Sequence, residues 1–227
     1  MLAILNNLCT IIENGLYYLT TSQTTIKRDR EYIQSLIVGA NFNMSEVRDK
    51  TEFALQNKPK KYSDIVSYVS GNAWLNSKIS KGDKLSDIDN EIYKSINDTV
   101  KETQPLSYPI TLFHGFERFT MYNEHIWKLR HTIYFPWFLS KTPSFDVALR
   151  FASTYDNNKF RQKFMVVNYP VGSKHIGLDI RAHDDEFEYL SKSGENLKLV
   201  RICKVSNFPY MMIFYVFKSK DYPKSKI

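Results

Sequence analysis

The sequence predicts an α+β fold in which helices precede strands. Residues 1–100 carry apolar side chains at steps of three and four, the period of a helix that packs on one side. Residues 108–217 instead contain short runs rich in β-branched and aromatic residues, which are typical of strands. Because the two kinds of element are segregated along the chain, an α+β architecture is favoured.

The composition predicts a globular chain that folds without disulfide bonds. The chain has 227 residues, of which 43% are hydrophobic, a proportion too high for general disorder. Cys9 and Cys203 are the only cysteines, so we expect no disulfide framework and a reducing, intracellular location.

The first twenty residues predict an amphipathic helix that packs on the domain. Apolar residues recur at helical spacing at Leu5, Leu8, Ile12, Leu16 and Leu19. Asn and Glu residues interrupt this run and no basic segment precedes it, so neither a signal peptide nor a membrane span is expected.

Two further helices are expected before the strands. The spacing over 62–82 predicts one helix that stops at Gly82, with apolar positions Ile65, Val69, Leu75 and Ile79. A second helix follows, with a capping box at Ser86 and Asp89 and an apolar stripe at Leu85, Ile88, Ile92, Ile96 and Val100. The stretch from 20 to 60 is weakly patterned, which places a boundary between an N-terminal helical segment (1–60) and the main domain (61–227).

Strands are expected over five runs, and one helix interrupts them. The runs are 108–113, 132–140, 164–169, 197–205 and 210–217. Thr142 is expected as the N-cap of the interrupting helix and Pro143 as its first residue. Phe145, Leu149 and Ala152 then form the apolar face of that helix.

Two of these strands end in polar residues suited to a ligand site. In TLFHGFE (111–117), His114 is followed by Gly115, where the backbone can approach a ligand closely. In FPWFLSKTPSF (135–145), Ser140 and Thr142 are two residues apart, so both hydroxyls point the same way in an extended segment. The alternative is structural: a satisfied histidine, an exposed serine and a threonine that only caps the helix.

The segment HDDEFEYL (183–190) concentrates acids around an aromatic ring. If 186–190 is extended, Glu186 and Glu188 project to one side with Cβ atoms roughly 7 Å apart, and Phe187 and Tyr189 project to the other and bury. Two neighbours on one strand cannot flank a sugar from opposite sides, as a glycosidase pair does. They suit one carboxylate that stabilises a cation and a second that handles a nucleophile. The alternative is an exposed acidic turn.

In this order, the three segments resemble the signature of the ADP-ribosyltransferase superfamily, in the branch of the arginine-modifying toxins. That branch has an aromatic-Arg-Gly strand end, a Ser-Thr-Ser strand followed by a helix, and a Glu-x-Glu strand followed by Leu. The chain has Phe113-His114-Gly115, Ser140-Lys141-Thr142 with Ala148 and Phe151, and Glu186-Phe187-Glu188 with Leu190. Upstream, Asn72 and Leu75 resemble the helix before the first strand, so the likeness covers about residues 60–217. It implies a mixed or antiparallel two-sheet β core.

The chain also departs from that branch at two positions. His114 stands where the branch has Arg, and a His-Gly pair is more similar to the diphtheria-toxin and poly(ADP-ribose) polymerase branch. Lys141 and Thr142 replace the last two residues of Ser-Thr-Ser. The Glu-x-Glu pair is intact.

The resemblance implies an NAD-dependent mono-ADP-ribosyltransferase that needs no metal. Glu188 would stabilise the cation formed at the ribose, Ser140 would orient Glu188, and Glu186 would bind the acceptor, an arginine of a protein. NAD would be bound by His114, Gly115, Ser140 and Thr142, with Arg161 or Lys159 near its pyrophosphate. For the basic loop that carries Arg161 and Lys159, plain solvent exposure is the alternative.

Other functions stay open from the sequence. An NAD glycohydrolase, or a transferase acting on nucleic acid, suits the net charge of +7, and a non-catalytic binding module could retain the fold. The basic clusters are KPKK (58–61) and the lysines of the C-terminal tail; they indicate either solvated faces or contact with an acidic partner. No membrane partner is expected.

Overall fold

The computed structural model describes residues 2–40, 43–70, 73–116, 127–153, 160–178, 188–207 and 209–219. Four residues singled out from the sequence, Asn72, Lys159, Glu186 and Phe187, lie outside the described residues.

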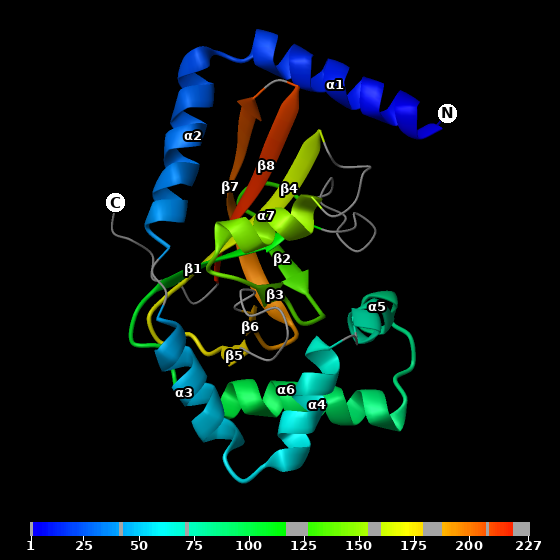
Figure 1. The fold of residues 1–227 in the computed structure, drawn as a ribbon, viewed down its shortest axis with the longest axis vertical. Coiled ribbons are helices and arrows are strands. Elements are labelled where there is room, and N and C mark those ends of the chain that lie inside the picture. The colour runs from blue at the N-terminus through cyan, green and yellow to red at the C-terminus, as the bar shows by residue number, and fades with distance from the viewer. Residues whose placement is uncertain are drawn as a thin grey trace.

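Helices come first along the chain, which confirms the α+β prediction (Figure 1). They are α1 (Leu2–Thr20), α2 (Gln23–Val38), α3 (Met44–Leu55), α4 (Pro59–Val69), α5 (Ala73–Lys81) and α6 (Asp87–Glu102). A further helix, α7 (Phe145–Ser153), lies between strands. In the described part of the chain no helix is both long and apolar enough to cross a bilayer.

The strands form two sheets, as the resemblance implies. They are β1 (Ile110–Gly115), β2 (Thr132–Phe135), β3 (Ser140–Lys141), β4 (Arg161–Tyr169), β5 (Ile176–Leu178), β6 (Glu188–Leu190), β7 (Glu195–Asn207) and β8 (Tyr210–Ser219). The larger sheet has the order β1-β4-β8-β7-β2 and the smaller one β3-β6-β5. The larger sheet is mixed, because β4 and β8 run parallel while its other described pairs are antiparallel.

The single strand predicted over 132–140 is wrong, because the chain changes sheets within it. β2 pairs with β7 of the larger sheet, and its last pair is Phe135 with Glu195. Pro136 follows, and proline has no N–H with which to extend the ladder. The chain then enters the smaller sheet, where Ser140 and Lys141 pair with β6.

The single helix predicted over 62–82 is also wrong, since it is divided into α4 and α5. α4 ends at Val69, where the N–H of Ser70 donates to the carbonyl of Val66. The sequence next contains Gly71, a poor helix former. The core positions and the stop are confirmed: Ile65 and Leu75 are fully buried, and Gly82 has φ +72°.

The capping box that starts α6 is confirmed, and so is most of its stripe. The Ser86 side chain accepts from the N–H of Asp89, and the Asp89 side chain accepts from the N–H of Ser86. Ile92, Ile96 and Val100 are buried. Ile88 is 68% exposed, so its predicted packing is wrong.

Three hydrophobic clusters hold the elements together. One lies between the sheets and joins Leu112 and Val167 of the larger sheet to Tyr189 of the smaller one. A second packs α4, α5 and α6 on the smaller sheet through residues such as Ile96 and Leu190. The third packs α2 and α7 on the other face of the larger sheet through Ile33, Ala148 and Phe164. Each cluster contains a residue from before position 60: Val47 in the first, Leu55 in the second and Ile33 in the third. The domain boundary at residue 60 stays a prediction.

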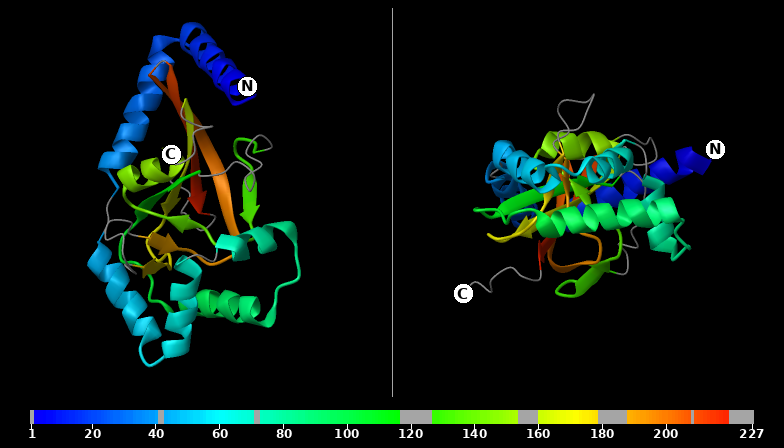
Figure 2. Two further views of the ribbon diagram at one scale, coloured as in Figure 1. Left: turned by 45° about the vertical axis from the view of Figure 1, so that its right-hand side comes forward. Right: turned by 90° about the horizontal axis from the view of Figure 1, so that it is seen from below.

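The helix predicted at the N-terminus is present as α1, but its expected packing face is wrong. Leu8, Ile12, Leu16 and Leu19 are between 50% and 80% exposed. α1 lies across one end of the larger sheet (Figure 2). It contacts the domain through the side that carries Asn14 and Tyr17. The reason is that Asn14 on that side satisfies two backbone carbonyls of the domain, those of Phe160 and Pro209.

The basic cluster KPKK is paired with acids of α6. Lys58 and Lys61 each bond Glu102 at 2.9 Å, and Lys60 bonds Glu91 at 2.6 Å. These contacts support the structural interpretation of the cluster, in which its lysines form surface ion pairs that help α4 to pack beside α6.

Candidate active site

His114 and Ser140 come together where β1 meets β3. The His114 ring nitrogen Nδ1 lies 2.7 Å from the backbone carbonyl oxygen of Ser140. A carbonyl oxygen can only accept a hydrogen bond, so Nδ1 carries the proton and Nε2 is an acceptor. Burial, together with the charge of Lys141, lowers the pKa of His114 to about 4. The imidazole is therefore neutral at pH 7 and presents an acceptor, whereas an arginine would present donors only.

A backbone bridge sets the spacing of these two segments. Phe113 and Thr142 exchange two backbone hydrogen bonds, of 2.7 and 2.8 Å. The predicted N-cap at Thr142, with Pro143 as first helical residue, is wrong because this bridge keeps Thr142 extended. The N-cap is Ser144, which accepts from the backbone N–H groups of Val147 and Ala148, and α7 begins at Phe145. The Thr142 hydroxyl accepts from the Ser144 N–H at 3.1 Å.

Gly115 is required by the packing of α7 on β1. A Cβ atom at this position would lie 1.9 Å from the carbonyl oxygen of Ala148 and 2.8 Å from the backbone nitrogen of Ala152. No side chain can be accommodated there. The close approach that the sequence predicted for a ligand is made, in the first place, by the protein's own helix.

Glu188 shares a sheet face with Ser140. In the register of β3 and β6, Ser140 lies opposite Leu190 and Lys141 lies opposite Tyr189. Glu188 is two residues before Leu190, so Ser140 and Glu188 are diagonal neighbours on one face, with Cα atoms roughly 7 Å apart. Tyr189 points to the other face and is fully buried, as predicted, while Leu190, on the same face as Glu188, is fully buried too. Glu188 itself is partly exposed.

Arg161 lies away from this convergence, at the start of β4. Its guanidinium forms an ion pair with Glu13 at 2.8 Å and donates to the Asn14 side chain at 2.9 and 3.2 Å. His114 is paired with Met165, four residues along β4, which corresponds to about 13 Å of strand. Arg161 therefore fixes α1 to the domain.

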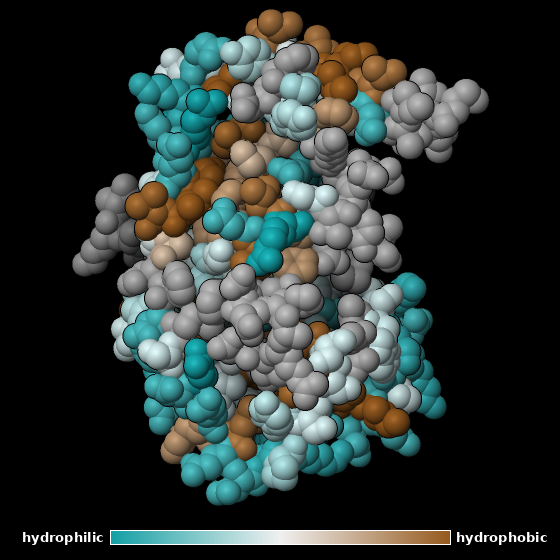
Figure 3. Space-filling model, viewed as in Figure 1, coloured by the Kyte–Doolittle hydropathy of each residue, from teal (hydrophilic) through white to brown (hydrophobic). Residues whose placement is uncertain are grey.

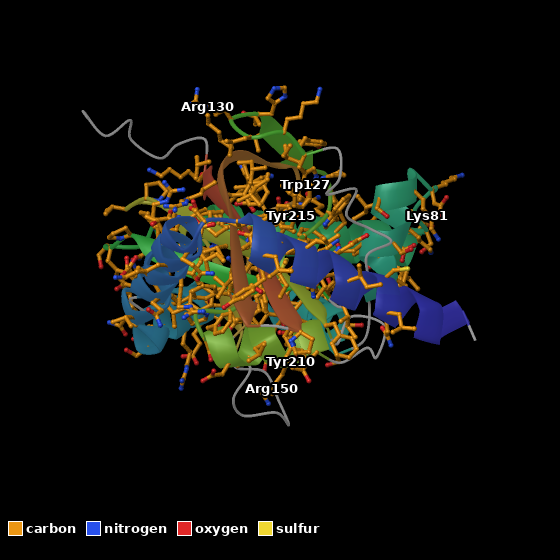
Figure 4. The ribbon with its side chains drawn as sticks, turned by 90° about the horizontal axis from the view of Figure 1, so that it is seen from above. Lys81, Trp127, Arg130, Arg150, Tyr210 and Tyr215 are labelled. Carbon is orange, nitrogen blue, oxygen red and sulfur yellow. The ribbon has the colours of Figure 1, made fainter. Side chains whose placement is uncertain are left out.

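A series of aromatic rings runs from His114 across the larger sheet to β8. The Phe116 ring lies 5.6 Å from that of His114, and Trp127 continues the series at 6.1 Å from Phe116. Trp127 packs edge-on against Tyr215 at 5.3 Å, and the two lie side by side in Figure 4. Phe116 and Tyr215 are buried in the core between the sheets, so these rings support the His114 side chain from one side.

Sequence reasoning missed a buried polar cluster behind the site. Lys141 alternates with Ser140, so its side chain passes to the opposite face, where it bonds Ser191 and lies 3.1 Å from a carboxylate oxygen of Glu195. The Tyr169 hydroxyl donates to the same carboxylate at 2.8 Å. The alternation of Lys141 with two hydroxyl residues was a signal for its direction. No local pattern identifies Glu195, 54 residues away.

His175 completes the cluster. Its ring lies 4.5 Å from that of Tyr169, and neither ring nitrogen has a hydrogen-bond partner among the described residues. Burial lowers the pKa of His175 to about 3, and burial also lowers the pKa of Lys141, against the opposing effect of Glu195. Across the described ranges, no group of three or more His, Cys, Asp or Glu side chains is arranged to hold a metal ion.

Comparison with solved structures shows that the fold of this chain is similar to that of ADP-ribosyltransferase toxins. Plx2a, an ADP-ribosyltransferase toxin from Paenibacillus larvae, matches with a TM-score of 0.61 at 12% identity, over 86% of this chain and 96% of that one. Exoenzyme S from Pseudomonas aeruginosa, solved with 14-3-3 protein beta and Carba-NAD, matches with a TM-score of 0.60 at 13% identity, over 88% and 92%. An ADP-ribosyltransferase from Clostridium botulinum matches with a TM-score of 0.57 at 15% identity, over 79% and 98%.

By sequence, neither a protein-family model nor a curated protein matches the chain. The likeness is therefore one of fold, and the chemistry has to be argued from the residues of this chain.

Proposed function

We propose that the chain transfers ADP-ribose from NAD to an acceptor and releases nicotinamide. The observation that carries the proposal is the convergence of His114, Ser140 and Glu188 in a fold shared with ADP-ribosyltransferase toxins. The finer proposal is that the acceptor is an arginine side chain of a protein, because Glu186 would add a second carboxylate beside Glu188.

The chemistry follows from the residue types. When the bond between ribose C1′ and the nicotinamide nitrogen breaks, nicotinamide leaves with the electron pair and the ribose becomes an oxocarbenium-like cation. Glu188 stabilises that positive charge, and Ser140, its neighbour on the same face, orients the carboxylate. A nitrogen of the acceptor then bonds to C1′, and its proton passes to Glu186.

His114 binds the substrate as a neutral acceptor. Its Nδ1 hydrogen is directed to Ser140, which makes Nε2 the atom that accepts from a ribose hydroxyl. This differs from the arginine of the toxin branch, which can only donate. Gly115 and Thr142 remain proposed NAD contacts, Thr142 through its hydroxyl because its backbone N–H and carbonyl already bond Phe113. A role for Arg161 would require it to leave Glu13 and Asn14.

Two observations bear on the partner and the place of action. The lysines of KPKK are paired with acids, which disfavours this cluster as a nucleic-acid contact. Cys9 and Cys203 are both free, which supports action in a reducing, intracellular compartment.

The test is a reaction of the purified chain with NAD labelled in its ADP-ribose part and a mixed cell lysate. We expect the label to become acid-insoluble, to be removed by protease and not by nuclease, and to be released by hydroxylamine with the kinetics of an arginine adduct. Label removed by nuclease would indicate a nucleic-acid acceptor. Nicotinamide release without transfer would indicate a glycohydrolase, and the absence of both would indicate a binding module.

A further inference from the structure

The outer face of α1 is an apolar surface that the described part of the domain does not cover. Figure 3 shows hydrophobic residues along the end of the molecule that α1 occupies. The exposed fractions are 50% for Leu8, 60% for Ile12, 56% for Leu16 and 80% for Leu19. A helix of a globular domain normally turns such a stripe inward. We propose that this face pairs with the same face of a second copy of the chain, antiparallel, about a two-fold axis at Ile12.

The inner face of α1 carries Asn14 and Tyr17 and is already used: the Tyr17 ring packs against the core of the domain. The Asn14 side chain is fully buried and donates to the carbonyls of Phe160 and Pro209 at 2.8 and 2.9 Å. Arg161 adds its contacts to Glu13 and Asn14. α1 is thus held on the domain by hydrogen bonds, and rotating it to bury the leucines would break all of them.

The outer face carries no net charge that would oppose a second copy. α1 contains no Lys or Arg, and its single acid, Glu13, is paired with Arg161. Like charges facing each other across a two-fold axis are unfavourable, because each charge meets its own copy. An uncharged Leu and Ile stripe avoids this repulsion and is complementary to itself.

The order of residues along the stripe is what favours a second copy over other partners. Counted from Ile12, leucines of the exposed face stand four residues away on both sides, at Leu8 and Leu16. In an antiparallel pair centred on Ile12, Leu8 of one copy therefore faces Leu16 of the other. An isologous contact requires this self-match, whereas a groove on a different protein does not.

A lipid surface fits less well. Helices that lie in a membrane interface carry Lys and Arg on the polar face, which contacts the headgroups. α1 has no basic residue, and its polar face is occupied by the domain. One helix pair is a small interface, so we expect a reversible dimer with a dissociation constant on the order of micromolar to tens of micromolar.

Sedimentation velocity of the full chain, from about 1 to about 200 µM, tests the dimer at the concentrations where weak interfaces form. We expect the mass to rise from one copy to two, and Ile12→Glu to keep the chain monomeric. Ile88→Glu is the matched control, since Ile88 is 68% exposed on another helix, and it should behave as the parent. A monomer at every concentration, or a dimer that Ile12→Glu leaves intact, would overturn the proposal.

Cysteine pairing tests the antiparallel arrangement in a Cys9→Ser background. Ile12→Cys should form a disulfide-linked dimer on mild oxidation, and Ile88→Cys should not. Leu8→Cys alone should form no disulfide-linked dimer, because two Leu8 residues would be about 12 Å apart along the axis, beyond disulfide reach. An equimolar mixture of Leu8→Cys and Leu16→Cys should pair. Efficient pairing of Leu8→Cys with itself would exclude the antiparallel arrangement. If the chain stays monomeric and Ile12→Glu abolishes flotation with phosphatidylcholine vesicles, a lipid surface is the occupant instead.

Discussion

The imidazole of His114 donates from Nδ1 to the backbone carbonyl oxygen of Ser140, 2.7 Å away. This contact joins the end of β1 to the start of β3 and fixes the tautomer of the ring. It also sets what the site can offer a ligand at this point: an acceptor nitrogen on a neutral ring whose pKa is lowered to about 4.

His114→Ala should weaken NAD binding and turnover by about tenfold to a hundredfold, since a hydrogen bond in a partly buried site is lost. Because the His114 ring is already neutral, its protonation should cause no loss of activity in the parent between pH 8 and about pH 5. Steady-state nicotinamide release across this range measures both effects. His131→Ala, at an exposed histidine, is the control. Unchanged NAD kinetics in His114→Ala would contradict the proposed role.

Stability should fall as the pH is lowered below about 6.5, before the carboxylates titrate. The pKa values of His114 and His175 are lowered in the folded state, to about 4 and about 3, so the unfolded chain binds more protons between those values and 6.5. Each histidine then removes about 1.4 kcal/mol of stability per pH unit in this window, and their full contribution is present only above about pH 6.5.

Urea unfolding at pH 7.5, 6.5 and 5.5 checks this linkage. His175→Phe should remove one of the two protons taken up on unfolding. The slope of the free energy of unfolding against pH should therefore fall by about half between pH 6.5 and 5.5. An identical slope in the parent and in His175→Phe would contradict the burial of a neutral His175.

Lys141→Met should destabilise the fold by about 3–5 kcal/mol, because it leaves Glu195 buried without its cation. Lys141→Met combined with Glu195→Gln should recover most of that loss. Lys60→Met is the matched control, since its partner Glu91 is exposed, and little change is expected. Chemical denaturation of the parent, Lys141→Met, Glu195→Gln and the double variant measures the coupling, with Lys60→Met run beside them. Additive effects of the two buried substitutions would contradict a paired cluster.

That His114, Ser140 and Glu188 share a site was implied by the family resemblance, and local pattern alone predicted less of the geometry. The His114–Ser140 contact and the register of Ser140 on β6 are consistent with that expectation, while the roles of the three residues stay a prediction. Thr142 was expected to cap a helix from local residue preference, and a backbone bridge to Phe113, 29 residues earlier by number, overrides that preference. The Lys141–Glu195 pair has no local signal, since it depends on two sheets that meet only after folding.

The helices show the same division between pattern and context. Spacing identified Ile65, Leu75, Ile92 and Ile96 as core residues, because a regular stripe normally faces the domain. The stripe of α1 is equally regular and yet faces outward, since the hydrogen bonds of Asn14 decide which side docks. Periodicity defines a face and leaves open what covers it.

Nicotinamide release and acceptor labelling by Glu188→Gln and Glu186→Gln, measured in parallel with labelled NAD, test the central claim most directly. Glu188→Gln should lower both rates by about a hundredfold or more, because the developing cation loses its counter-charge. Glu186→Gln should abolish labelling of arginine and retain slow hydrolysis, since water needs less positioning than a guanidinium. Glu91→Gln, at an exposed carboxylate, should match the parent. If Glu188→Gln released nicotinamide within a few-fold of the parent rate, the assignment of this site as the catalytic centre would be contradicted.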